Sequence, residues 1–432
     1  MAWMKGLLTR AASLHASLSQ YSTNGRIESS LAWPTAEIES LGGWCALSLS
    51  VPHCTGSSFT YEFRAESYGT SWYHSHFSAQ YNDGLFGPMI IYGPEHVHYD
   101  IDLGPIILSD YIHQSYRGMI EGVAKKVPIG PIFPNVDNNL INGKGVFNCN
   151  STLGGVCTPN AGLSKFKFTQ GKTHRLRLIN SGSAGTQKFS IDDHQLQVIA
   201  VDYVPIIPYT TNVVTLAIGQ RADVLVTASG QSTAIYYDDA NTTIAPTTTG
   251  VAWDSNDCAN DPLYLTTPYT VIQPPDTPAV TQNMEITVGV NGSGSALFIV
   301  NNMTFRADYN SPLLLLASQG TPVSTLPLDW NIYNFSTSTS IRIHLTNLWE
   351  TPHPMHLHGH DFWGPSRRER HLGWNHHNPY NPLRRDTHLM RPGTKNDPSY
   401  LVIEFEADNP GVWPLHCHTS THVSAAVVGQ YF

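Results

Sequence analysis

The sequence predicts an all-β fold made of Greek-key β-sandwich domains. Charged residues make up only 13% of the 432 residues, whereas glycine (34) and proline (29) are frequent. Short runs rich in valine, isoleucine and aromatic residues alternate with turn residues along the chain. Strands at this spacing are typical of sandwiches or barrels rather than of βαβ units, and no amphipathic helix of useful length interrupts them.

The predicted strands follow one another at short intervals and are bounded by turn residues. In chain order they are residues 59–65, 87–94, 174–180, 194–209, 222–229, 284–291, 341–348, 401–408 and 425–432. At roughly 150 residues per domain, the chain has room for three domains. Boundaries are expected at 95–104, after a strand ending in YGP, and at 266–281, which contains the Pro/Thr-rich stretch VIQPPDTPAVTQ. The predicted domains are residues 1–97, 105–265 and 282–432.

Charge and hydropathy exclude two classes of partner. The net charge of −9 argues against nucleic acid, which favours basic proteins. No stretch approaches the roughly 18 uninterrupted apolar residues of a membrane span. The first 30 residues also lack the apolar run of a signal peptide.

The composition nevertheless favours a secreted protein. Five Asn-x-Ser/Thr glycosylation triplets lie in turn-rich segments, at Asn150, Asn241, Asn291, Asn302 and Asn334. Among the six cysteines, Cys149 and Cys157 flank a short glycine-rich loop and could form a local disulfide, although sequence alone does not fix the pairing.

Histidine pairs in two segments predict metal ligands. GTSWYHSHFSAQ contains His74 and His76, and HPMHLHGHDFW contains His353, His356 and His358. Side chains alternate faces along a strand, so His-x-His places two imidazoles on one side, about 7 Å apart. Both imidazoles of a pair can therefore reach one metal cluster.

A third segment, GVWPLHCHTSTHV, combines histidines with a cysteine. Alternation points His416 and His418 one way and Cys417 the other, so one strand can serve two metal centres. A thiolate with two imidazoles is the ligand set of a blue-copper electron-transfer site, and Cys417, His353 and His422 supply it. The nitrogen-only pairs suit copper that binds dioxygen. A lone His-x-His is usually incidental, but three ordered segments around a thiolate favour copper.

These segments resemble three of the four copper signatures of multicopper oxidases and, more narrowly, of laccases from filamentous fungi. The likeness runs from about Ser57 onward and includes RLINSG, FSIDDH and NPLRRDTHLMRPG. It implies three cupredoxin-like Greek-key β-sandwich domains and four copper ions, one of type 1, one of type 2 and two of type 3. It also implies a secreted, monomeric enzyme that takes single electrons from phenolic or aromatic reductants and reduces dioxygen to water.

The resemblance assigns each ligand a role. It implies type 1 copper on His353, Cys417 and His422 and a type 2 ligand at His356. The implied type 3 ligands are His74, His76, His358, His416 and His418. Val427 falls at the axial position of the type 1 site, where an aliphatic side chain does not coordinate. The other histidines considered are expected to be surface or loop residues rather than ligands: His53, His96, His98, His113, His174, His194 and His388.

The fourth signature, His-Trp-His-Gly, is absent from the sequence. Without it the cluster lacks one type 2 and one type 3 ligand. Where it should fall, residues 30–37 read SLAWPTAE, and with suitable codons a reading frame one nucleotide later gives His-Trp-His-Gly. The same offset gives family-like strings for 50–55 and 364–377. We therefore attribute the segment 30–56 and residues 364–377 to an error in the sequence or to a decayed gene.

This hypothesis removes several residues from functional consideration. No role is assigned to His371, His376, His377, Arg367 or Arg368, and Cys45 and Cys54 are not interpreted as a disulfide. The strands that normally precede the first histidine pair are also missing, so the first predicted domain is incomplete. Unpaired sheet edges are a folding liability.

Two other functions stay open. A ferroxidase or pigment-forming oxidase can use the same scaffold, although no convincing acidic cluster for a ferrous ion is evident. A copper-binding pseudo-enzyme would keep type 1 copper without reducing oxygen, with about one copper ion per chain instead of about four. The position where related laccases carry a substrate-binding carboxylate is Lys188, with Asp192 and Asp193 nearby. A lysine accepts no proton unless burial depresses its pKa, which weakens the case for phenols.

Overall fold

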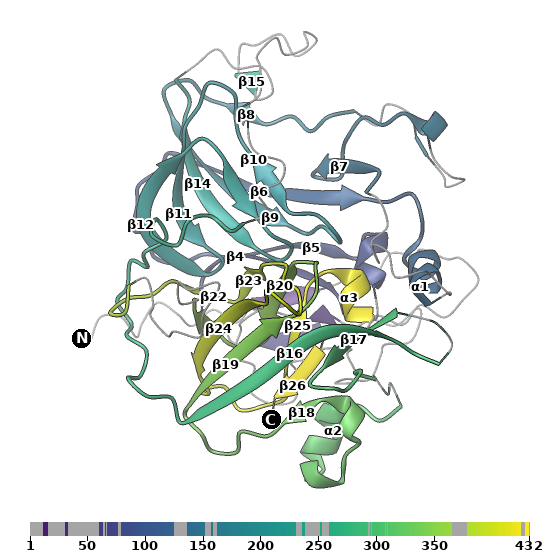
Figure 1. Ribbon diagram of the computed structural model, residues 1–432. Helices are drawn as coiled ribbons and strands as arrows, with labels where there is room; N and C mark the ends of the chain where they lie inside the picture. The colour runs from purple at the N-terminus through teal and green to yellow at the C-terminus, as the bar shows by residue number, and fades with distance from the viewer. Residues whose placement is uncertain are drawn as a thin grey trace.

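The all-β prediction is confirmed by a computed structural model, in which strands β1 to β26 outnumber the few short helices (Figure 1). The structure describes residues 12–15, 31–32, 60–63, 65, 67–76, 79–124, 136–151, 157–158, 162–229, 236–237, 251–252, 259–292, 294, 296–306, 308, 310–364, 378–424 and 428–431. Cys45, Cys54, His53, Val427 and residues 365–377 lie outside these ranges. Among the described residues, no helix is long and apolar enough to cross a membrane.

The N-terminal strands form two small sheets. Strand β1 (Ala12–His15) pairs with β3 (Thr60–Phe63), and β2 (Leu31–Ala32), β4 (Gly69–Ser75) and β5 (Phe86–Ile91) form a sheet in the order β2-β4-β5. The 3-10 helix η1 (Gln80–Asp83) connects β4 to β5. Strand β4 is almost entirely buried and contains His74, and His76 follows its last residue.

A six-stranded sheet follows, in the order β12-β11-β14-β9-β6-β7. Its strands are β6 (Ile101–Tyr111), β7 (Asn138–Ile141), β9 (Thr173–Asn180), β11 (Leu196–Val201), β12 (Val204–Thr211) and β14 (Arg221–Thr227). Two short pairs accompany it: β10 (Gln187–Phe189) with β13 (Val214–Leu216), and β8 (Lys167–Phe168) with β15 (Tyr236–Tyr237). Helix α1 (Tyr116–Ala124) and the 3-10 helix η2 (Cys149–Ser151) lie in the connections.

The C-terminal strands form two sheets. The first has the order β17-β16-β19-β24-β21-β22, from β16 (Val280–Val290), β17 (Ala296–Val300), β19 (Ser340–Asn347), β21 (Phe362–Trp363), β22 (Arg384–Arg385) and β24 (Ser399–Glu406). The second has the order β18-β26-β25-β20-β23, from β18 (Ile332–Tyr333), β20 (His353–Leu357), β23 (Thr387–Met390), β25 (Trp413–Cys417) and β26 (Val428–Tyr431). The short helices are α2 (Leu313–Ser318), η3 (Val323–Thr325), η4 (Leu328–Trp330) and α3 (Ser420–Ser424).

The C-terminal core follows from strand alternation. In β19, Ile341, Ile343 and Leu345 are fully buried, and they belong to one apolar cluster with Leu357 and Cys417 of the other sheet. Each buried branched side chain contributes about 1.5–3 kcal/mol relative to an exposed one. The packed core thus fixes β20 and β25, the two strands that carry most of the predicted ligands.

Strand β4 lies between the teal six-stranded sheet and the green and yellow C-terminal sheets (Figure 1). The buried guanidinium of Arg221 in β14 ties these parts together. Its Nη1 and Nη2 donate to both carboxylate oxygens of Asp386 at 2.6 and 2.7 Å, and its Nε donates to the backbone carbonyl of Thr70 in β4 at 3.1 Å. One side chain therefore contacts all three groups of strands.

The local disulfide is also confirmed. Cys149 and Cys157 are bonded, with their Cα atoms 5.7 Å apart. The disulfide closes a short loop, because the two cysteines are 8 residues apart in the sequence. The bond therefore joins residues that are close in sequence rather than distant parts of the chain.

Candidate metal centre

Two neighbouring strands present the predicted ligands to opposite sides of one sheet. β20 and β25 are antiparallel, with His356 opposite His416 and Met355 opposite Cys417. Residues directly opposite on paired strands project to the same face. His356 and His416 therefore share one face, and Cys417 lies on the other, as strand alternation predicts.

On the thiol face, Cys417 meets His353 and His422. Cys417 Sγ lies 3.3 Å from His422 Nδ1, which lies 3.1 Å from His353 Nδ1. His353 begins β20, whereas α3 brings His422 back over the end of β25. The ring of Phe298 packs on both imidazoles, with centroids 5.4 and 4.5 Å away. We call Cys417, His353 and His422 the thiol cluster.

Burial sets the charge state of the thiol cluster. It lowers the pKa of His353 to about 3 and that of His422 well below its usual value, so both imidazoles are neutral at ordinary pH. Burial also raises the pKa of the Cys417 thiol to about 12. A bound metal ion deprotonates a coordinating thiol outright. In its buried, apolar environment the cluster therefore offers a metal ion two imidazole lone pairs and a thiol that becomes a thiolate on metal binding.

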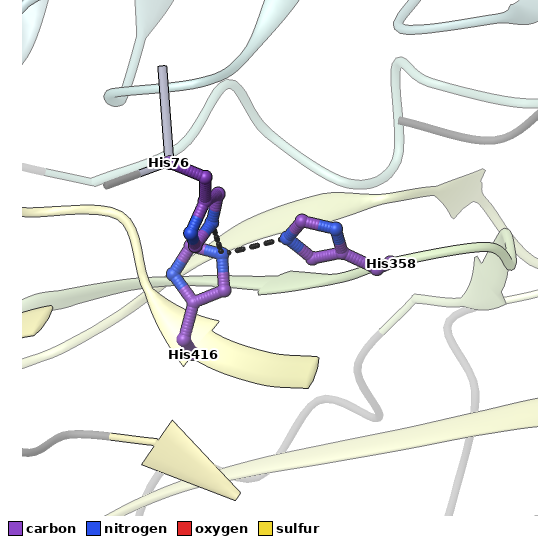
Figure 2. Close-up of side chains that lie close together, drawn as sticks. All are labelled: His76, His358 and His416. Carbon is purple, nitrogen blue, oxygen red and sulfur yellow. Dashed lines mark hydrogen bonds between the residues drawn. The ribbon is translucent and has the colours of Figure 1, made fainter. Parts of the chain in front are cut away.

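On the opposite face, three imidazoles from separate segments converge. His76 Nε2 and His358 Nε2 lie 3.2 and 2.8 Å from His416 Nε2 (Figure 2). His416 donates its Nδ1–H to the carbonyl of Cys417 at 2.9 Å, so the Nε2 of its neutral ring carries a lone pair toward the other two. Burial lowers the pKa of all three, to about 3 for His416. We call His76, His358 and His416 the imidazole cluster.

The remaining predicted ligands lie beside the imidazole cluster. The ring centroid of His418 is 5.2 Å from that of His74 and 5.7 Å from that of His356. Trp72 stacks on both His74 and His418, with centroids 4.4 and 5.4 Å away. His356 donates its Nδ1–H to the carbonyl of Asp386 at 2.9 Å, which directs its Nε2 away from that strand. All the predicted site residues thus lie in one buried region.

Donor chemistry shows that copper fits both clusters. Each has three ligand atoms within 4.8 Å of one another and fully buried side chains. A thiolate with two imidazoles is the blue-copper donor set, and imidazole alone suits copper as well. Both contacts of the imidazole cluster end on His416 Nε2, whose single lone pair cannot fully accept from His76 and His358 at once; a cation held by the three Nε2 atoms would relieve this.

Several residues that shape this region were given no role by the sequence analysis. Trp72 and the Arg221–Asp386 pair are identified by contacts alone, the latter spanning 165 residues. Thr387 Oγ1 lies 3.0 Å from His356 Nδ1 and donates to Asp386 Oδ1 at 2.9 Å. Lys188 lies in β10, where its ammonium donates to Thr215 Oγ1 at 3.4 Å.

The expectation that the other histidines are surface or loop residues is wrong for His174 and His388. His174 lies in β9 fully buried, stacks on Phe168 at 4.3 Å and accepts a backbone N–H from Thr169. His388 is buried in β23 beside the amide of Asn260. His194 is buried too, but it lies in a loop, as expected. A neutral imidazole that has a hydrogen-bond partner can be buried in a protein core. The sequence does not show which histidines are neutral and buried in this way.

The comparisons with known proteins agree on one family. Family models described as multicopper oxidase match residues 49–96, 102–257 and 292–432. Laccase-2 of Botryotinia fuckeliana is 34% identical over 421 residues, covering 88% of this chain and 68% of the relative. A laccase of Cryphonectria parasitica is 32% identical, covering 86% and 66%. The crystal structure of the laccase from Botrytis aclada matches with a TM-score of 0.80 at 30% identity, over 94% of this chain and 78% of that chain.

The fold and the two clusters define a copper oxidoreductase assembled from cupredoxin-type sandwiches. The chain belongs to the multicopper oxidase family, and its relatives are of the laccase type. Copper is accordingly its cofactor.

Gly219 packs against the ring of His418, and a larger residue at this position would clash with it. Gly219 has φ +84°, and a Cβ there would lie 2.6 Å from His418 Cδ2. We expect Gly219→Ala to lower the free energy of unfolding by the roughly 1 kcal/mol of a left-handed alanine plus about 1–3 kcal/mol for overpacking. Gly171→Ala is the matched control, since Gly171 has φ +75° and open space around its Cα. Equal losses in urea unfolding of the two variants would contradict a steric role for Gly219.

Proposed function

We propose that this chain is a laccase-type oxidase that takes single electrons from small phenol-like aromatic reductants at the thiol cluster and passes them to dioxygen. One observation carries the proposal. Cys417 lies in the thiol cluster, while its covalent neighbours His416 and His418 lie on the opposite face with the other imidazoles. The hydrogen bond from His416 Nδ1 to the carbonyl of Cys417 adds a second link at 2.9 Å.

The residues of the thiol cluster suit electron transfer. Copper held by one thiolate and two imidazoles changes oxidation state by one electron at a time. His353 and His422 stay neutral because they are buried, so they hold the cation without taking up protons. Phe298 packs on both rings, which are fully buried. We assign these three ligands to the type 1 site and the remaining predicted histidines to the oxygen-reducing side.

We further propose that the protein is secreted, glycosylated and monomeric. Four of the five sequon asparagines, Asn150, Asn291, Asn302 and Asn334, are exposed, and Asn241 lies outside the described residues. Exposed sequons in turns are the sites that glycosylation requires. The family relatives are fungal laccases, which supports the same compartment.

Anaerobic reduction tests the proposed function directly. The copper-loaded full chain is expected to be blue, to lose its colour when mixed with a phenolic reductant under nitrogen, and to regain it in air. Visible absorption and coupled phenol products are the readouts. A chain that binds copper but shows no blue colour, or a colour that phenols do not bleach, would sink the proposal.

A further inference from the structure

We infer that this chain holds two copper ions rather than the full laccase complement of four. One ion belongs to the thiol cluster and the other to the imidazole cluster, whose three ligands all come from residues after 75. Within the described residues, His74, His356 and His418 lack a full ligand set. This inference rests on the proposed function through its assignment of copper to the thiol cluster, and it restricts copper on the oxygen-reducing side to the imidazole cluster.

The residues of the imidazole cluster are buried and lie in or next to paired strands. His76 follows β4, His358 follows β20 and His416 lies in β25, and each is at most 3% exposed. Their ligand nitrogens already lie within 4.8 Å of one another, as in the thiol cluster. Preformed convergence of three imidazoles leaves little ordering entropy to oppose metal binding.

The other three imidazoles do not converge in this way. Within the described part of the chain, His74, His356 and His418 belong to no group of three ligand atoms within 4.8 Å. Two of them stack on Trp72 instead, which gives their rings an apolar partner. His74 and His418 thus form a pair, and His356 stands beside it as a single ligand.

The strand next to His74 supplies no imidazole from its two residues. β2 pairs with β4 so that Ala32 lies opposite His74 and Leu31 opposite Ser75. β2 falls within residues 30–37, where the absent His-Trp-His-Gly signature is expected. Alanine and leucine have no ligand atom. Strand β2 therefore adds no ligand nitrogen to His74, His356 and His418.

The copper number expected from the structure differs from the sequence-based one. The absent signature alone suggests that a remnant would keep about one copper ion, at the type 1 site. The convergence of the imidazole cluster raises the expectation to two, because none of its three ligands comes from residues 30–37.

Copper counting on the full chain tests the inference. After loading with excess copper and desalting, we expect about two copper ions per chain by elemental analysis, from one blue site and one imidazole site in the electron paramagnetic resonance spectrum. A content near four would show that the other ligands come from elsewhere in the chain and would overturn the inference. A content near one, with only the blue signal, would overturn it as well.

Matched variants assign each ion. His76→Ala should lose one ion and keep the blue colour, whereas His74→Ala, two residues away on the same face, should keep both. Cys417→Ser should keep one ion without the blue colour. Loss of an ion in His74→Ala would overturn the assignment of His74 to the incomplete set. Another outcome separates this inference from the proposed function. If the unmodified chain were colourless and bound one ion, and if His76→Ala lost that ion, the proposed function would be refuted while the imidazole site would stand.

Discussion

Cys417→Ser is expected to abolish the blue colour and to reduce phenol oxidation by more than about 100-fold, because changes to residues behind a metal ligand already cost roughly 10–100-fold in metal affinity or activity. The serine hydroxyl has nearly the shape of the thiol but does not ionise at neutral pH. The side chain is fully buried in the C-terminal core, so the hydroxyl also adds about 1–3 kcal/mol of desolvation cost. Visible absorption and the rate of phenol oxidation are the measurements.

Met355→Leu provides the control for packing at the same place. Met355 lies opposite Cys417 on β20 and is 2% exposed. A methionine-to-leucine exchange conserves volume and costs less than about 1.5 kcal/mol. The variant should remain blue and active. If both substitutions removed the colour alike, packing around the strand would explain the loss, and if Cys417→Ser kept the colour, the thiolate would have no part in it.

Strand periodicity made the division of the site predictable from sequence. The two-residue alternation of side chains along 416–418 is a local property of extended backbone, and it holds whatever the rest of the chain does. The separation of Cys417 from His416 and His418 follows from it, as does the all-β class from the spacing of strands and turns. These are the features that the structure reproduces.

Contacts between distant segments were predicted only through the family resemblance and not from strand periodicity. The imidazole cluster needs His76 beside His416, residues 340 apart in the chain, and no periodicity encodes that approach. The buried positions of His174 and His388 were missed for a related reason. Their rings contact Phe168, Thr169 and Asn260, partners that only the folded sheet supplies.

The buried ion pair between Arg221 in β14 and Asp386, which lies between β22 and β23, leads to the second large prediction. Arg221 and Asp386 side chains are 1% and 0% exposed. Removing one partner of such a pair leaves an uncompensated charge inside the protein. We expect Arg221→Met to lower the free energy of unfolding by about 3–5 kcal/mol, measured by urea unfolding.

Lys172→Met gives the matched comparison, because Lys172 also pairs with an aspartate, Asp100, at 3.0 Å, but its side chain is 51% exposed. Solvent screens that pair, and its loss should cost less than about 1 kcal/mol. Similar losses for the two variants would contradict the role of burial.

Replacing both partners separates charge from packing. In Arg221→Met with Asp386→Leu the buried carboxylate is gone, so stability should recover part of the loss, as apolar replacement of a buried pair is often nearly neutral. The backbone carbonyl of residue 386 still accepts from His356 in this double variant, which keeps that imidazole oriented. Absence of any recovery would mean that Arg221 stabilises the molecule mainly through its other contacts, the hydrogen bond to the Thr70 carbonyl in β4 and the ion pair with Asp202 at 3.4 Å.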